Sequence, residues 1–171
     1  MLIDRLLLII AALVLLISVN VNGQDSTKVL SAHEIVQLIP DEVKDFKKSE
    51  KPVSKVIKVG GIQYSLCDKR FSNNDKNIKL LLFDFKEAPI MYSQAIRKWS
   101  LATTVDSDTV VQRALVIEGC EGWETYNQPM NSSQIFLGIH KRFFLTIEGE
   151  RVGLETLKSL LQEVELSKYP K

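Results

Sequence analysis

With 171 residues and a formal net charge of +1, this chain has the length of one ordinary domain and no excess charge that would attract nucleic acid. Its 45% hydrophobic content, together with five prolines and eight glycines that do not cluster, excludes a disordered or low-complexity chain. The sequence holds no glycine-rich phosphate loop, no metal-ligand set and no other cofactor motif, so we predict no cofactor.

The N-terminus is the most informative part of the sequence for location. An apolar run of 14 residues (6–19) follows Asp4 and Arg5. As a helix it would span about 21 Å, which is short of the roughly 30 Å hydrocarbon core of a membrane. These proportions predict a secretory signal peptide over residues 1–23, and a retained membrane anchor is the alternative because Asp4 offsets the charge of Arg5. Either form exports the chain to the periplasm or the cell exterior.

Residues 24–30 are polar and are predicted to form a loose tail, and residues 31–171 are predicted to form a single domain. Ser31 and Glu34 have the spacing of a capping box at the start of a helix. Apolar residues at helical spacing follow them, so we expect a helix over residues 32–39, ended by Pro40.

The next segment has the alternating pattern of β-strands separated by tight turns. Glycines at 60–61 predict a hairpin turn, and the Asn-Asn-Asp sequence at 73–75 predicts a second one. Residues 78–85 are rich in Leu and Phe, which indicates a central strand that is covered on both faces.

The second half of the chain repeats strands between two helices. Pro89 opens a predicted helix over residues 89–101, and leucines at helical spacing predict a final helix over residues 154–166. Strands are expected at 109–117, 123–126, 135–139 and 143–147, with a turn at 119–122. Trp99 and Trp123 fall on apolar faces and are predicted to belong to the core.

Strands that follow one another through short turns favour antiparallel pairing. We therefore expect an α+β fold, with a mainly antiparallel sheet of six to seven strands and about three helices. This element order resembles small exported bacterial domains of the PsbP/Mog1-like α/β/α sandwich kind, over most of residues 31–166. The resemblance implies the fold alone, and no functional residue is transferred from it.

Cys67 and Cys120 are the only cysteines. In an oxidising compartment an even pair is able to form a disulfide, and a bridge here would close a loop of about 54 residues. We predict that Cys67 and Cys120 pair and join the two groups of strands. The alternative is two buried thiols that never meet.

The densest run of charge holds six lysines and two acidic residues within residues 44–58. The lysines are Lys44, Lys47, Lys48, Lys51, Lys55 and Lys58. The first four are candidate binding residues for an anionic surface, and a solvated face is the alternative. The run contains one aromatic residue, Phe46, which does not indicate a base-stacking surface for nucleic acid.

A cluster of carboxylates surrounds the predicted turn at 119–122. Glu118, Glu121 and Glu124 would support hydrolase chemistry if they converged with His140 in one pocket. A solvated acidic hairpin is the simpler interpretation of the same residues.

No catalytic signature is present in the sequence. The prediction for function is therefore an exported, non-enzymatic domain that binds a protein or an envelope component. Two alternatives remain: a hydrolase that uses the carboxylate cluster, and a membrane-anchored domain that binds a small ligand. Contact with a membrane is expected through the N-terminal segment.

Overall fold

The computed structural model describes residues 28–100 and 102–171, and it has one nine-stranded sheet packed with α-helices. The predicted α+β class and the antiparallel sheet are confirmed, since every strand pair is antiparallel. The sheet exceeds the expected six to seven strands because it also contains two-residue strands, which are too short to leave a sequence pattern. The predictions for residues 1–23 and for most of the tail lie outside the described residues.

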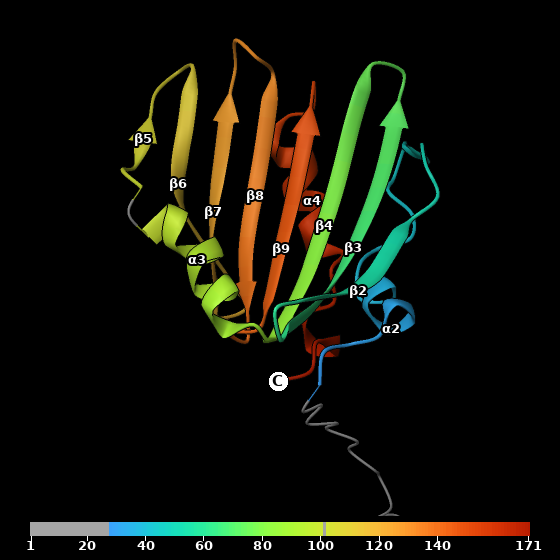
Figure 1. Cartoon of the computed structure of the whole chain (residues 1–171). Coiled ribbons are helices and arrows are strands. Elements are labelled where there is room, and N and C mark those ends of the chain that lie inside the picture. Colours follow the sequence, from blue (N-terminus) through green and yellow to red (C-terminus); the bar gives the residue numbers. More distant parts are fainter. Residues whose placement is uncertain (1–27, 101) are drawn as a thin grey trace, which may run out of the picture.

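The sheet order is β1-β3-β4-β9-β8-β7-β6-β5, and β2 also pairs with β3 (Figure 1). The strands are β1 (Lys47–Lys48), β2 (Val53–Val59), β3 (Ile62–Asn73), β4 (Lys76–Glu87), β5 (Val105–Asp106), β6 (Val110–Ile117), β7 (Cys120–Asn127), β8 (Ser132–Ile139) and β9 (Phe143–Glu150). Because β1 and β2 pair with different parts of β3, they follow each other along one edge of the sheet.

Helices cover both faces of the sheet. The helices are α2 (Ala32–Val36), α3 (Pro89–Ser100), α4 (Leu154–Gln162) and the short 3-10 helix η1 (Leu166–Lys168). Figure 1 shows α3 in front of the strands and α4 behind them. In the part of the chain that the structure describes, no helix combines the length and the apolar character needed to cross a membrane.

The main hydrophobic core lies between the sheet and α4, and α2 packs into the same core. Alternate residues of the three central strands point into it and are almost completely buried: Leu80, Leu82, Ile135, Leu137, Leu145 and Ile147. Leu157 and Leu161 of α4 close this core from the other side. The alternation of strand side chains leaves their neighbours on the opposite face, where α3 lies.

The predicted capping box at the start of α2 is confirmed. The Ser31 hydroxyl accepts a hydrogen bond from the Glu34 amide, and the Glu34 carboxylate accepts one from the Ser31 amide at 2.7 Å. Hydrogen bonding to the Ser31 side chain, and then to its amide, lowers the pKa of Glu34. The helix ends at Val36, earlier than predicted. Its last turn tightens, because the amides of Gln37 and Leu38 bond to carbonyls three residues back instead of four.

The hairpin between β6 and β7 corrects the predicted turn at 119–122. The turn consists of Glu118 and Gly119, which have positive φ angles of 47° and 78° and so suit a two-residue hairpin. Cys120 already belongs to β7. Gly122 also lies within the strand, where a Cβ atom would come within 2.2 Å of the Phe136 carbonyl oxygen. That glycine therefore allows close strand packing and does not form the turn.

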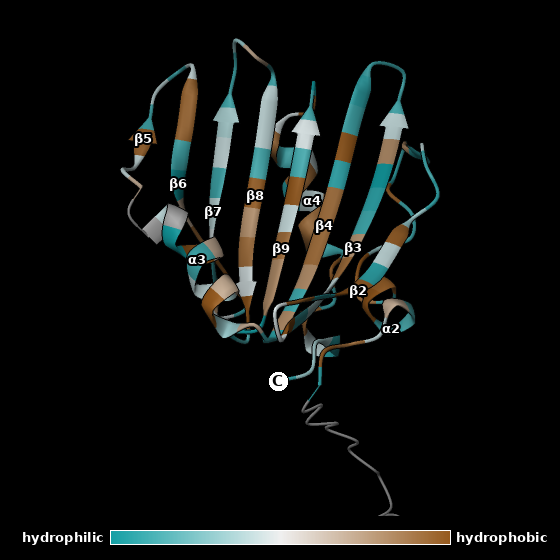
Figure 2. Cartoon of the chain, in the orientation of Figure 1, coloured by the Kyte–Doolittle hydropathy of each residue, from teal (hydrophilic) through white to brown (hydrophobic). Residues whose placement is uncertain are grey.

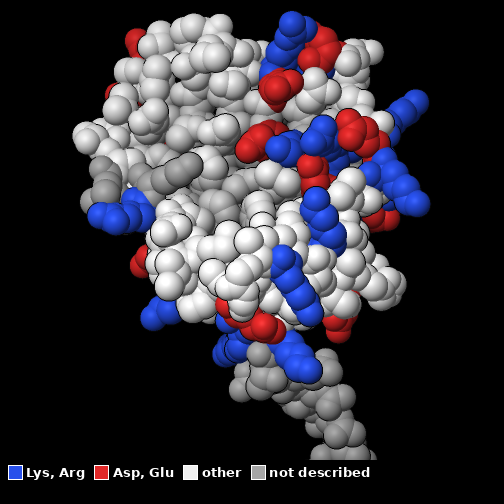
Figure 3. Space-filling view, viewed as in Figure 1, with Lys and Arg blue, Asp and Glu red and all other residues white. Residues whose placement is uncertain are grey.

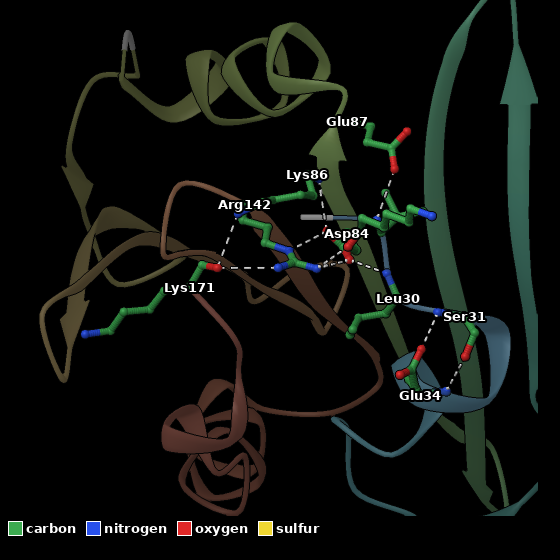
Figure 4. A network of polar contacts seen from close by, with 10 residues as sticks. Leu30, Ser31, Glu34, Asp84, Lys86, Glu87, Arg142 and Lys171 are labelled. Atoms are coloured by element: carbon green, nitrogen blue, oxygen red, sulfur yellow. Dashed lines mark hydrogen bonds and ion pairs between the residues drawn. The ribbon is translucent and has the colours of Figure 1, made fainter. Parts of the chain in front are cut away.

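A buried ion pair fixes both ends of the described chain to the sheet (Figure 4). The Arg142 guanidinium donates to the Asp84 carboxylate from Nε at 2.8 Å and from Nη2 at 2.7 Å. The same carboxylate accepts the Leu30 amide at 2.8 Å. Arg142 also donates to the main-chain carbonyls of Lys28 and Lys171, at 3.1 and 3.5 Å. One charged pair therefore connects the first and last described residues to β4 and to the β8–β9 turn.

Helix α3 lies close to the sheet at Gly138, where an added Cβ atom would lie 2.5 Å from the Tyr92 hydroxyl oxygen. We expect Gly138→Ala to lower the free energy of unfolding by about 1–3 kcal/mol, because the added methyl group would overpack the contact between β8 and α3. Urea denaturation measures the change. Adding Tyr92→Phe removes the clashing oxygen and should restore most of the loss, and equal loss in the single and double variants would contradict this account.

Candidate functional site

The face of the sheet beneath α3 carries a continuous band of aromatic side chains. Trp123 and Phe136 are opposite each other on β7 and β8, and Phe144 of β9 is opposite Phe83 of β4. The rings of Phe136 and Phe144 are nearly parallel, with centroids 6.3 Å apart. Trp99 of α3 lies nearly parallel to both of them, at 6.0 and 5.6 Å. Strands β4, β7, β8 and β9 and helix α3 therefore all contribute to one aromatic surface.

This band borders a pocket of about 360 Å³ between the end of α3 and the sheet. Its lining residues are Ala95, Trp99, Ala102, Gln112, Trp123, Thr125, Phe136 and Phe144. Figure 3 shows this face hollowed beside an uncharged surface. Trp123 is buried, as predicted, whereas Trp99 is only half-buried, and both line this pocket.

Two polar side chains interrupt the apolar wall of the pocket. Gln112 of β6 and Thr125 of β7 are cross-strand partners, so their side chains are neighbours on the pocket face. No ionisable side chain occurs among the described residues that line the pocket. The arrangement is suited to an apolar molecule that carries one uncharged hydrogen-bonding group.

Charge gathers on another part of the same face, over β3 and β4 (Figure 3). Figure 2 shows the corresponding change along the central strands, which are hydrophobic in their lower parts and hydrophilic toward the upper hairpins. A second pocket, of about 470 Å³, lies among these charged residues. Arg70 pairs there with Glu50 at 3.3 Å, and Lys79 pairs with Glu148 at 3.8 Å. Because these charges already neutralise one another, the aromatic pocket is the stronger candidate site.

The predicted disulfide between Cys67 and Cys120 is wrong. Both thiols are free and buried, Cys67 on β3 and Cys120 on β7. The strands β4, β9 and β8 lie between them, and four strand spacings correspond to about 19 Å. A disulfide requires Cα atoms within about 7 Å. The alternative of two buried thiols that do not meet is the one the structure contains.

Both thiols should therefore react slowly while the protein is folded. Burial raises the pKa of Cys67 to about 11 and also raises that of Cys120, so little reactive thiolate exists near pH 8. We expect a chromogenic disulfide reagent to detect two thiols rapidly in denatured, unreduced protein and only slowly in native protein. Equal reaction rates in the two states would contradict the burial of these thiols.

The structure does not bring the predicted carboxylates together around one cavity. Glu124 is 2% exposed and faces the α4 side of the sheet, where Arg113 Nε lies 2.6 Å and Lys158 Nζ 3.3 Å from its Oε1. Glu118 and Glu121 are exposed at the β6–β7 hairpin. His140 is exposed at the turn that follows β8. None of the four lines the aromatic pocket.

The four candidate lysines lie in β1, which pairs with β3, and in the segments beside β1, and none of them lines the aromatic pocket. They are Lys44, Lys47, Lys48 and Lys51, and all are exposed. Lys47 and Lys48 form β1, and Lys48 pairs with Asp41 at 2.7 Å. Lysine on an edge strand is a known protection against unwanted strand pairing, so this placement has a structural reason as well.

The pocket itself was missed at the sequence level. Trp123, Phe136 and Phe144 lie on three different strands, and each alternates with residues that face the main core. That alternation indicates a second apolar face. Only the strand order, however, reveals that the three rings are neighbours.

Within the described part of the chain, no three or more His, Cys, Asp or Glu side chains are arranged to hold a metal ion. The similarity in element order to PsbP/Mog1-like domains stays a prediction. No known protein family, curated protein or solved structure matches this chain.

Proposed function

We propose that this chain is an exported domain that binds a small, uncharged, largely apolar ligand in the pocket beneath the end of α3. The observation that carries the proposal is a pocket with four aromatic rings in its wall and no ionisable side chain among its described lining residues. Sites for small molecules are typically apolar clefts of about 300–1,000 Å³ with a few polar groups that fix orientation. The aromatic pocket has both properties.

The four rings favour a flat apolar molecule. Trp99, Phe136 and Phe144 present nearly parallel planes, with interplanar angles between 10° and 25°. A planar ligand stacked against such faces buries a large area on rigid side chains. Gln112 and Thr125 would then bind a single carbonyl or hydroxyl group at the other wall.

The described lining residues carry no ionisable group, which supports binding over acid–base chemistry at this site. General acid–base catalysis needs a titratable group within hydrogen-bonding reach of the reacting atom. The carboxylates considered for hydrolysis lie outside the lining of the pocket, and Glu124 is already held by Arg113 and Lys158. The placement of these carboxylates supports the binding of a small ligand over the hydrolase alternative.

Binding of N-phenyl-1-naphthylamine, an uncharged fluorescent aromatic, tests the proposal. We expect its fluorescence to rise and saturate at one molecule per chain. Ala95→Phe would fill the pocket from α3 and should weaken binding at least about tenfold, since lost apolar contacts and a steric clash act together.

Gln94→Phe is the matched control, because residue 94 is exposed on the same helix and does not line the pocket. It should leave the affinity unchanged. The sulfonated analogue of the probe should bind more weakly than the neutral one, since none of the described lining residues carries a positive charge. Equal affinity of the two variants for the neutral probe would show that this pocket is not the binding site.

A further inference from the structure

The edge of the sheet formed by β2 is a second surface with an unusual composition. Among the described residues β2 pairs only with β3, so the outer side of β2 carries the unpaired backbone groups of an edge strand. Its three valines are exposed, with Val53 at 50%, Val56 at 38% and Val59 at 65%. Helix α2 contacts β2, but no described strand pairs with its outer side. Exposed β-branched residues on such an edge strand are the features that a pairing strand would cover.

The same edge is basic along its whole length. Five lysines and one glutamate occur between Lys47 and Val59; Glu50 pairs with Arg70 at 3.3 Å, and Lys48 pairs with Asp41 at 2.7 Å. Lys55 and Lys58 belong to β2 itself, and both are exposed. A second copy of this edge would bring like charges together, which opposes self-pairing.

We propose that the outer edge of β2 binds an extended, acidic segment of a partner protein by adding it to the sheet as a further strand. Backbone hydrogen bonds would supply affinity, and alternate side chains would supply specificity, as in other cases of strand addition. The valines provide apolar contact, and the lysines select for carboxylates. This surface is separate from the aromatic pocket and does not depend on a ligand there.

The register of β2 defines the partner further. Lys55 is opposite Leu66, which puts it on the pocket face of the sheet, and Lys58, opposite Gln63, lies on the other face. In a strand added beside β2, the two residues that face Lys55 and Lys58 would also be three positions apart. The expected partner therefore has two acidic residues at that spacing in an extended, β-branched segment.

A fluorescein-labelled nine-residue peptide of valine and threonine, with glutamate at its fourth and seventh positions, tests this by fluorescence anisotropy. We expect saturable binding to the wild type. The charge-reversed variant Lys55→Glu/Lys58→Glu should lose about tenfold or more in affinity and should instead bind the peptide that carries lysine at those two positions. Lys76→Glu/Lys141→Glu makes the same charge change at exposed sites off this edge and should bind like the wild type.

Two further tests complete the experiment: one separates strand addition from simple charge attraction, and the other separates this proposal from the pocket proposal. The acidic peptide with alternate amides N-methylated should not bind, because it is unable to pair along its backbone. Ala95→Phe should bind the acidic peptide normally, so a failure of the pocket proposal leaves this test intact. The proposal is overturned if the N-methylated peptide binds equally well, if no acidic peptide binds, or if the protein binds phosphatidylglycerol vesicles and not the peptide.

Discussion

Replacing Asp84 with asparagine is expected to lower the free energy of unfolding by about 3–5 kcal/mol, because the substitution removes the carboxylate charge that faces the buried Arg142 guanidinium. Both side chains are almost fully buried, at 0% and 3% exposure. The Asp84 carboxylate also accepts the Leu30 amide, so the N-terminal segment loses an attachment at the same time. Urea unfolding followed by circular dichroism measures the loss.

The exposed pair between Asp75 and Arg151 provides the matched control. Its N–O distance of 2.6 Å is similar, but both side chains are 61% exposed. Solvent screens such a pair, so Asp75→Asn should leave stability nearly unchanged. In the Asp84→Asn protein, trypsin should also cleave faster after Lys28, whose carbonyl accepts a hydrogen bond from Arg142. Similar effects of the two substitutions on stability would contradict a structural role for the buried pair.

Phe143 and Phe144 are adjacent, but we expect Phe143→Ala mainly to lower stability and Phe144→Ala mainly to weaken probe binding. Phe143 is completely buried in the main core, where its ring meets that of Tyr169 edge-on at 5.1 Å. Its removal should lower the free energy of unfolding by about 3–5 kcal/mol. Phe144 lines the pocket on the other face, so Phe144→Ala should be less destabilising and should weaken binding of N-phenyl-1-naphthylamine at least about tenfold.

These two variants test whether one face of β9 serves folding and the other serves binding. Urea unfolding and probe titration are carried out on both proteins, with the titration at a temperature where each is folded. Normal probe affinity in Phe144→Ala would count against the pocket. A selective loss of probe binding in folded Phe143→Ala would place the site on the α4 side of the sheet instead.

Most local features of this fold were predictable because they depend on residues close together in the chain. The capping box of Ser31 and Glu34 needs only a three-residue spacing, and it is present. The hairpin at Gly60 and Gly61 needs two residues that tolerate positive φ, and both have it. The buried central strand β4 follows from its own apolar composition. The turn before β7 was misplaced because glycines at 119 and 122 look alike in sequence, although one forms the turn and the other allows strand contact.

The sequence by itself determined the α+β class, the turns and the antiparallel pairing of neighbouring strands, since each depends on short-range periodicity and turn chemistry. The order of distant strands was decided only in the tertiary structure. Pairing of β4 with β9 joins residues 59 to 73 positions apart in the chain, and it separates Cys67 from Cys120 by three intervening strands. The same long-range pairing brings Trp123, Phe136 and Phe144 together beneath α3. Residue spacing along the chain does not predict such contacts, because they depend on which buried faces pack best in the complete sheet.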